Sequence, residues 1–459
     1  MPEYIIHTLG CKLNQLESEA ISSLFSELNY RIFNPHEYSG LDAEAPLVII
    51  NTCTVTSKAD QKARRLIRKV LRDHPASRII VTGCYAQLNK DDLQKLETDN
   101  KQRLFVVKKE EIISFLQNLF KIDNKKSDSL CVLSASTFRR NDTSLRDKNT
   151  INQFEFNPAR FSEHTRSLLK IQDGCSKKCT YCKIRLARGL SISLDKKEVL
   201  SRLRLLEKNH AEAVLTGVSI SQYRDNNTNA DLTGLLEYLL NGTEKVTLRL
   251  SSLTPDYIDE NFTKVLSGKR IRPHFHLSVQ SGSKKILDKM GRTYDVHTIE
   301  NAVILLRCAK DDPFLACDII TGFPGETEIE FMETYNMCKK LDFAWIHVFP
   351  YSKRDGTEAY LFKDNVKESE VSKRVRLFTE LADKSRENYV QRWLDREVDV
   401  LIEKSKNDKT CHGVSENYLK VLIKFSGNMP PSGTVLRCKL IESSLNAEYD
   451  VIGEPLDDK

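Results

Sequence analysis

The chain has 459 residues, enough for about three domains at the usual ~150 residues each. Hydrophobic residues make up 40% and charged residues 29%, which is typical of a globular protein and excludes a disordered chain. No apolar run approaches the roughly 18 residues that a membrane span requires, and the N-terminus lacks the pattern of a signal peptide. The net charge of +6 is too small to indicate a polyanionic partner by itself. Without a signal peptide, we expect a cytoplasmic protein, and in that reducing compartment its twelve cysteines are more simply free thiols or metal ligands than disulfides.

Residues 1–120 alternate short apolar runs with amphipathic stretches, which is typical of a doubly wound, parallel α/β sheet. The predicted strands are Tyr4–His7, Leu47–Asn51 and Arg78–Thr82. The predicted helices are Gln15–Leu28 and Lys58–Arg72. Residues 121–160 are polar and irregular, so we expect a connector between the first domain and the next.

The alternation resumes in a second domain, over residues 161–392. Its six predicted strands are Leu168–Ile171, Ala213–Thr216, Val246–Leu250, His274–Val279, Leu315–Ile320 and Trp345–Phe349. Helical patterns separate them, such as Lys197–Lys208 and Thr298–Ala309. Six such units can form a partial (β/α)6 barrel, whose chemistry belongs at the C-terminal ends of the strands.

A long amphipathic helix is predicted to end this domain. Its apolar positions are Val371, Val375, Phe378, Ala382 and Tyr389. Residues 393–455 then contain short apolar runs (VDVLIEK, YLKVLIKF, TVLRCKL and AEYDVIG) broken by Gly, Asn and Pro. This pattern predicts a small antiparallel β-barrel as a third domain.

Three cysteines follow the first predicted barrel strand: Cys175, Cys179 and Cys182, in CSKKCTYC. A loop this short can bring three sulfurs to one side of a metal centre. Zinc usually needs a fourth protein ligand, whereas a [4Fe–4S] cluster accepts three and leaves one iron open for a substrate or cofactor. The strand-end position favours the cluster, and a zinc knuckle completed by a distant Cys or His is the alternative.

A second group is spread over the N-terminal domain, where Cys11, Cys53 and Cys84 each follow a predicted strand (YIIHTLGC, LVIINTC and RIIVTGC). The carboxyl ends of parallel strands lie along one edge of a sheet, so these thiols can converge. Any one of them alone is more simply explained as a buried core residue. Their shared position favours a second cluster with three protein ligands. The remaining cysteines show no such pattern and are expected to be structural: Cys131, Cys308, Cys317, Cys338, Cys411 and Cys438.

CSKKCTYC resembles the cluster loop of radical S-adenosylmethionine (SAM) enzymes, and the additional Cys11, Cys53 and Cys84 resemble the two-cluster pattern of methylthiotransferases. The segments HTRSLLKIQDGC, HLSVQSGS, DIITGFPGETE and HVFPYSKRDGT extend the resemblance over nearly the whole chain. TLGCKLNQLESEA is similar to the branch that acts on threonylcarbamoyladenosine in tRNA. The isopentenyladenosine branch usually has Gly-Cys-Gln-Met-Asn here, and the ribosomal-protein branch Gly-Cys-Pro-Lys-Asn.

The resemblance implies an N-terminal cluster domain, a radical SAM barrel and a C-terminal TRAM domain, a small β-barrel that binds RNA. It implies two [4Fe–4S] clusters: one on Cys175, Cys179 and Cys182 that binds and cleaves SAM, and an auxiliary one on Cys11, Cys53 and Cys84 that holds the incoming sulfur. The 5′-deoxyadenosyl radical would abstract hydrogen from C2 of the modified adenine at position 37. No catalytic residue beyond the ligands is predicted.

Two further pairs of residues are candidates in the barrel domain. Ser278 and Gln280, at the end of a strand in HLSVQSGS, can hydrogen-bond SAM, with a core or turn role as the alternative. Gly322 and Gly325 in TGFPGE are as well explained by a turn.

Three segments depart from the family pattern. Lys183-Ile184-Arg185 stands after Cys182 where the family often has Ile-Ile-Pro. VSISQYRDNN follows Gly217 in place of a segment with His and further Gly, and Thr254 replaces a Glu. These changes leave the six cysteines intact and concern the SAM and substrate pockets.

A basic stripe follows Cys53. Lys62, Arg65, Lys69 and Arg72 recur at helical spacing, opposite an apolar stripe of Ala63, Ile67 and Val70. A solvated helix face is the usual explanation of such a run, but its place beside a predicted cluster favours contact with RNA phosphates. The third domain has no such excess of positive charge, and its RNA binding rests on resemblance.

The sequence thus predicts a monomeric tRNA methylthiotransferase that draws electrons from an unidentified donor and needs no membrane. The alternatives are the same chemistry on isopentenyladenosine or on a ribosomal-protein aspartate, and a non-catalytic RNA-binding protein with structural zinc.

Overall fold

The structure is a computed structural model, and it describes residues 3–27, 30–32, 46–98, 101–119, 154, 166–407, 410–425, 430–446 and 448–456. Contacts divide the chain into two compact units. The first comprises Met1–Ser162, Asp173–Lys177 and Cys182–Leu194, and the second Glu163–Gln172, Lys178–Tyr181 and Asp195–Lys459. The predicted connector and Cys131 lie outside the described residues, apart from Phe154. No helix in the described ranges combines the length and the apolar character needed to cross a bilayer.

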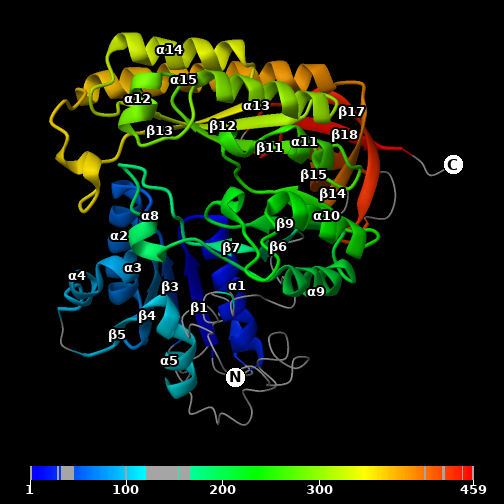
Figure 1. Cartoon of the computed structure of the whole chain (residues 1–459). Helices are drawn as coiled ribbons and strands as arrows, with labels where there is room; N and C mark the ends of the chain where they lie inside the picture. Colours follow the sequence, from blue (N-terminus) through cyan, green and yellow to red (C-terminus); the bar gives the residue numbers. More distant parts are fainter. Residues whose placement is uncertain are drawn as a thin grey trace. The chain divides into compact units, whose positions relative to one another are not determined.

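The first unit is built on one parallel sheet with the strand order β2-β1-β3-β4-β5 (Figure 1). Its strands are β1 (Glu3–Thr8), β2 (Arg31–Ile32), β3 (Leu47–Thr52), β4 (Ile79–Gly83) and β5 (Leu104–Val106). Because the chain proceeds in opposite directions from β1, to β2 on one side and to β3 on the other, the sheet is doubly wound, as predicted.

Helices of the first unit cover both faces of this sheet. They are α1 (Lys12–Glu27), α2 (Ser57–Asp73), α3 (Cys84–Leu88), α4 (Lys90–Gln94), the 3₁₀ turn η1 (Lys109–Glu111) and α5 (Ile112–Leu119). Helix α2 buries Ala63, Ile67 and Val70 in the core that also contains Val48 and Ile50, so the predicted apolar stripe is confirmed. Side chains alternate along a strand, and Tyr4, on the other face, stacks on Phe25 of α1 at 4.7 Å between ring centroids.

Six parallel strands of the second unit form the predicted partial barrel. They lie in two three-stranded groups, of order β10-β9-β6 and β11-β12-β13. Two isolated β-bridges connect these groups, one from Leu248 to Ile271 and one from Leu253 to Leu277. The strands are β6 (Ser167–Lys170), β9 (Glu212–Thr216), β10 (Thr247–Leu250), β11 (His274–Gln280), β12 (Phe314–Thr321) and β13 (Trp345–Pro350). All six coincide with predicted strands, which confirms the βα alternation.

The intervening helices are α9 (Lys196–Glu207), α10 (Leu232–Gly242), α11 (Glu260–Leu266), α12 (Lys284–Lys289), α13 (Val296–Ala309) and α14 (Glu328–Lys340), with 3₁₀ turns η2 (Ile220–Gln222), η3 (Pro255–Tyr257) and η4 (Glu358–Leu361). Short elements after β6 are β7 (Gln172–Asp173), α8 (Ile184–Arg188) and β8 (Ile192–Ser193). Aspartates cap four of these helices by accepting backbone N–H bonds: Asp195, Asp231, Asp259 and Asp295. Gly322 and Gly325 both have positive φ, at 78° and 82°, which confirms the turn after β12.

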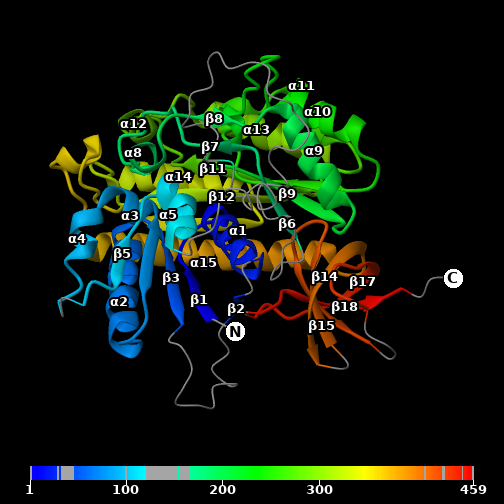
Figure 2. The same ribbon diagram turned by 90° about the horizontal axis from the view of Figure 1, so that it is seen from below.

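A long helix leads into the third predicted domain, which is a closed barrel of order β14-β15-β16-β18-β17 (Figure 2). The elements are α15 (Glu368–Trp393), β14 (Glu397–Asn407), β15 (Thr410–Ser415), β16 (Lys420–Lys424), β17 (Val435–Ser443) and β18 (Val451–Pro455). The pair β16–β18 is parallel and the other four are antiparallel. A closed ring with an odd number of strands cannot alternate throughout, so one parallel pair is unavoidable.

Buried charges join this barrel to the strands β9 and β10. Arg249 is 1% exposed and donates from Nε and Nη2 to the carboxylate of Glu212 at 2.7 and 3.0 Å. It also donates to the backbone carbonyls of Ser415 and Glu416, at the end of β15, at 3.3 and 3.2 Å. Tyr418 lies under the guanidinium, 5.1 Å from ring centroid to Cζ. The barrel core is also continuous with α15 and β12.

Candidate iron–sulfur sites

The first unit gathers Cys11, Cys53 and Cys84 at one edge of its sheet. Cys53 directly follows β3, Cys84 follows β4 and begins α3, and Cys11 lies between β1 and α1. Each thiol therefore follows the carboxyl end of its strand, where the sequence placed it, and its role as a metal ligand stays a prediction.

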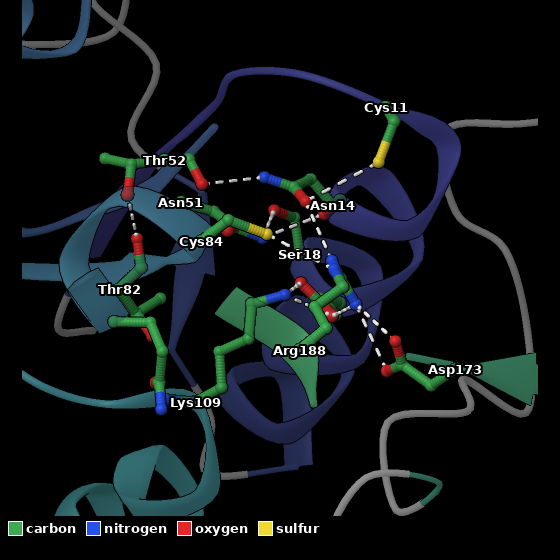
Figure 3. A network of polar contacts seen from close by, with 12 residues as sticks. Cys11, Asn14, Ser18, Asn51, Thr52, Thr82, Cys84, Lys109, Asp173 and Arg188 are labelled. Atoms are coloured by element: carbon green, nitrogen blue, oxygen red, sulfur yellow. Dashed lines mark hydrogen bonds and ion pairs between the residues drawn. The ribbon is translucent and has the colours of Figure 1, made fainter. Parts of the chain in front are cut away.

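Two side chains hold these strand ends together (Figure 3). Asn14 donates from Nδ2 to the carbonyls of Leu9 and Thr52, at 2.8 and 3.0 Å, and so connects the Cys11 loop with the end of β3. Thr52 donates from Oγ1 to the carbonyl of Thr82 at 2.6 Å and accepts from the Ala86 N–H at 3.2 Å, which connects β3 with the Cys84 turn. Sequence reasoning missed Asn14, because only the structure shows that this polar residue of α1 is fully buried.

Glycines allow the backbone to approach closely at this edge. Gly10 has φ +110°, and a Cβ there would lie 2.8 Å from the Cys53 sulfur. Gly83 has φ +98°, and a Cβ there would lie 2.3 Å from the Thr52 carbonyl oxygen. Both positions therefore exclude any other residue without a shift of the backbone.

Replacing Gly83 by Ala should lower the free energy of unfolding by more than about 1 kcal/mol, because the new methyl group meets backbone as well as an unfavourable φ. Gly189→Ala is the matched control, since its φ is also positive, at +74°, but nothing lies within 4 Å of the new Cβ. Urea unfolding of cluster-free protein would measure both changes. Equal losses in the two variants would mean that the close approach at Gly83 is unimportant.

Burial and charge set the state of the thiols. Burial first, and then the neighbouring Cys11 and Cys84, raise the pKa of the Cys53 thiol to about 11. Cys53 is therefore protonated at neutral pH until a metal displaces the proton. A cation offsets the charge that thiolates would bring, because Arg188 of α8 donates from Nε to the Cys84 sulfur at 3.2 Å. Sequence reasoning missed Arg188, since an isolated arginine after a metal loop is most simply read as exposed.

Thiolates are the ligands that iron–sulfur clusters use, and three of them at one sheet edge beside a guanidinium suit such a group. The described residues include no set of three His, Cys, Asp or Glu side chains already spaced as metal ligands. The fit therefore rests on the chemistry and the placement of the donors.

The predicted SAM-cluster loop has residues in both units, and hydrogen bonds hold it within each of them. In the first, the Cys175 N–H donates to the Gly189 carbonyl at 3.0 Å, and Gly174 adopts φ +66° against Leu190. In the second, Thr180 donates to the carbonyl oxygens of Met290 and Lys289, from its N–H at 3.1 Å and its Oγ1 at 2.8 Å.

An aromatic residue and a cation accompany Cys179 in the second unit. Tyr181 accepts from Arg292 Nη2 at 2.6 Å and packs edge-on against Phe323, with ring centroids 6.3 Å apart. Although burial opposes the charged form, Tyr181, Tyr294 and Cys179 keep the pKa of Arg292 above its usual value. Arg292 therefore stays positive beside Cys179, a feature that the sequence did not reveal.

The predicted SAM residues Ser278 and Gln280 lie at the end of β11. Gln280 adopts φ +70° where the register between β11 and β12 shifts, an irregularity of the kind found at functional sites. Earlier in the same strand, His276 is hydrogen-bonded to Asp318 of β12 at 2.9 Å and to Ser252 at 3.3 Å. Both side chains of the His276–Asp318 pair are about one-fifth exposed, at 21% and 20%, so this pair remains accessible.

The basic stripe is also where the sequence predicted it. Lys62, Arg65, Lys69 and Arg72 are all exposed on α2. Arg72 pairs with Asp73 at 2.9 Å. The side chain of Arg64, between the two stripes, donates to the Tyr85 hydroxyl at 2.6 Å. The stripe is thus available to a phosphate backbone, and RNA contact stays a prediction.

Comparisons with known proteins agree with this division of the chain. Residues 3–105 match a family described as "Uncharacterized protein family UPF0004", and residues 169–338 match the radical SAM superfamily. The threonylcarbamoyladenosine tRNA methylthiotransferase MtaB of Treponema pallidum is 36% identical over 95% of this chain and 97% of its own length. The MtaB of Bacillus subtilis is 32% identical over 96% of this chain and 94% of its own.

A relative with another substrate is more distant. The tRNA-2-methylthio-N(6)-dimethylallyladenosine synthase of a Psychrobacter species is 28% identical over 91% of this chain and 84% of its own length. Iron–sulfur and SAM chemistry comes with the radical SAM superfamily to which residues 169–338 belong. With the identities above, the paired matches show that the chain belongs to the MtaB family of radical SAM methylthiotransferases.

Proposed function

We propose that the protein adds a methylthio group to C2 of N6-threonylcarbamoyladenosine at position 37 of tRNA, with SAM as cofactor and in the cytoplasm, where tRNA is found. The observation that carries this proposal is the sequence identity of 36% and 32%, over nearly the whole chain, to two proteins named for that substrate. The placement of Cys11, Cys53 and Cys84 at one sheet edge supports it, because the reaction needs a second sulfur-carrying site.

In this proposal the two groups of cysteines bind different clusters. Cys175, Cys179 and Cys182 hold the cluster that binds SAM, and Cys11, Cys53 and Cys84 hold the auxiliary cluster. When bound, these groups supply the 5′-deoxyadenosyl radical and the sulfur. The chain itself holds the thiolates, balances their charge with Arg188 and Arg292, and offers Ser278 and Gln280 as hydrogen-bonding partners for SAM.

The proposed domains follow the same division. Residues 1–120 form the auxiliary-cluster domain, 161–392 the radical SAM core and 393–455 a TRAM-like RNA-binding barrel, with a connector over 121–160. We propose that the protein acts as a monomer and takes its electrons from a separate reducing partner.

Nucleoside mass spectrometry of tRNA, from cells with and without the gene, tests the reaction and its substrate together. We expect the methylthio form of threonylcarbamoyladenosine to disappear with the gene and to return with a plasmid copy. Loss of the methylthio form of isopentenyladenosine would instead support the alternative substrate of the more distant relative. An unchanged nucleoside profile would reject both tRNA substrates and leave the ribosomal-protein aspartate.

Metal analysis of the anaerobically purified protein distinguishes the proposed iron–sulfur enzyme from a zinc-containing RNA-binding protein. Two clusters predict about eight irons with matching sulfide, whereas a non-catalytic RNA-binding protein predicts zinc.

We also propose that the basic stripe of α2 contacts tRNA phosphates near the anticodon loop. Arg65→Glu with Lys69→Glu should weaken tRNA binding strongly at low salt and much less at high salt. Each lost phosphate contact lowers the log–log salt slope by about 0.7–0.9. SAM cleavage without tRNA should be unchanged, because neither residue is expected at the SAM-cluster loop.

A tRNA-binding titration at several salt concentrations measures this effect. The control is Arg376→Glu with Lys384→Glu, which reverses two exposed cations on α15. If both double variants had the same affinity and slope, the stripe would be an ordinary solvated helix face.

A further inference from the structure

Arg188 is the most enclosed charge at the auxiliary site. Its side chain is 2% exposed, and each of its three nitrogens has a partner (Figure 3). Nε donates to the Cys84 sulfur at 3.2 Å, and Nη2 to Asn14 Oδ1 at 3.2 Å. Nη1 donates to both oxygens of Asp173, at 3.0 and 3.1 Å, and to Glu17 Oε1 at 3.2 Å. The rigid fork of a guanidinium can serve all these partners at once.

The charges around Arg188 balance. Glu17 also accepts from Lys109 Nζ, at 2.7 and 2.8 Å, so two carboxylates face two cations in this buried group. A guanidinium stays protonated in proteins, so Arg188 directs one cationic N–H at the Cys84 sulfur.

Asp173 and Arg188 flank the loop of Cys175 and Cys182 in the sequence. Asp173 lies two residues before Cys175, and Arg188 lies six residues after Cys182. Their ion pair closes this loop at its base, and the Cys175 N–H bond to Gly189 next to Arg188 reinforces the closure. The base of one predicted cluster loop is thus joined to a cysteine of the other predicted cluster.

We propose that Arg188 is a positioning residue for the auxiliary cluster: it holds the Cys84 sulfur through Nε and, through Asp173, fixes the base of the SAM-cluster loop to the same site. This rests on the proposed function of Cys11, Cys53 and Cys84 as ligands. A cationic N–H bonded to a ligand sulfur stabilises the reduced, more negative cluster, so Arg188 raises its reduction potential.

The test uses full-length protein in which Cys175, Cys179 and Cys182 are all replaced by Ala, so that iron can be held only by the auxiliary site. In this background Arg188→Met, Arg188→Lys and the control Arg185→Met are compared. Arg185 is an exposed arginine on the same helix. Iron per chain, the electron paramagnetic resonance spectrum of the reduced cluster, its midpoint potential and the rate of iron loss to a chelator are measured.

Arg188→Met should shift the midpoint potential to a more negative value, alter the spectrum and weaken iron retention about 10–100-fold. Arg188→Lys should lie between Met and the parent, because one ammonium keeps the charge but cannot reach both Cys84 and Asp173. Arg185→Met should match the parent.

Two results would overturn the proposal or its premise, and they are distinguishable. If the parent background binds no iron, the auxiliary ligand assignment fails, and with it the proposed function. If the parent binds iron, and if Arg188→Lys and any folded Arg188→Met keep the potential and spectrum of the parent, Arg188 is only a structural ion-pair partner. Should Met prevent folding, the Lys variant alone decides between these outcomes.

Discussion

Cys179→Ala should abolish reductive cleavage of SAM and reduce bound iron by about half. The loop would keep only two thiolates, which is too few to hold the SAM cluster, while the auxiliary cysteines remain intact. The backbone around Cys179 should stay in place, because Thr180 is held by Met290 and Lys289 and not by the thiol. The assay is formation of 5′-deoxyadenosine with dithionite as reductant, together with iron analysis.

A matched control shows whether the loss of SAM cleavage and iron is specific to Cys179. Cys308→Ala removes an exposed thiol on α13 that is not among the predicted ligands, and it should change neither readout. Unimpaired 5′-deoxyadenosine formation by Cys179→Ala would exclude this loop as the SAM site.

Cys53→Ala should have the complementary effect. It should remove the auxiliary cluster and stop methylthiolation of tRNA, while SAM cleavage survives at the other cluster. The substitution removes a buried sulfur that contacts the Gly10 turn, so the backbone should tolerate the smaller side chain. Product nucleosides and 5′-deoxyadenosine are measured on the same samples.

Thermal unfolding of the cluster-free proteins shows whether Cys53→Ala is folded, and Cys411→Ala, which also removes a buried thiol, is its control. Methylthiolated tRNA at the parent rate from Cys53→Ala would mean that the three strand-end cysteines do not act together.

Sequence periodicity predicted the architecture because its signals are local. Each strand of the barrel is a short apolar run between helical patterns, and each coincides with a strand of the structure. Strand β15 was missed because TCHGVS is short, polar and contains a glycine. The edge strands β2 and β5 are two and three residues long, too short to produce a pattern.

The cysteine groups were predictable from position alone, because strand ends are local and a parallel sheet aligns them. The environment of the thiols was not. Arg188 is 104 residues from Cys84 in the sequence, and Asn14 is 38 residues from Thr52. Contacts of this range depend on the packed chain, and no periodicity reports them. Arg292 was missed for the same reason, since its partner Tyr181 is 111 residues away.

The buried pair of Arg249 and Glu212 means that the C-terminal barrel is no detachable module. A chain ended before β14 would lose the carbonyls of Ser415 and Glu416 and the ring of Tyr418, and would leave the Arg249 guanidinium only partly bonded. Removing partners from a buried charge is among the most destabilising changes a protein can undergo. The same cut would uncover apolar residues of α15 such as Tyr389 and Trp393. Loss of activity on deletion would therefore report a damaged catalytic core, and the contribution of this barrel to RNA binding can be read only from substitutions on its outer surface.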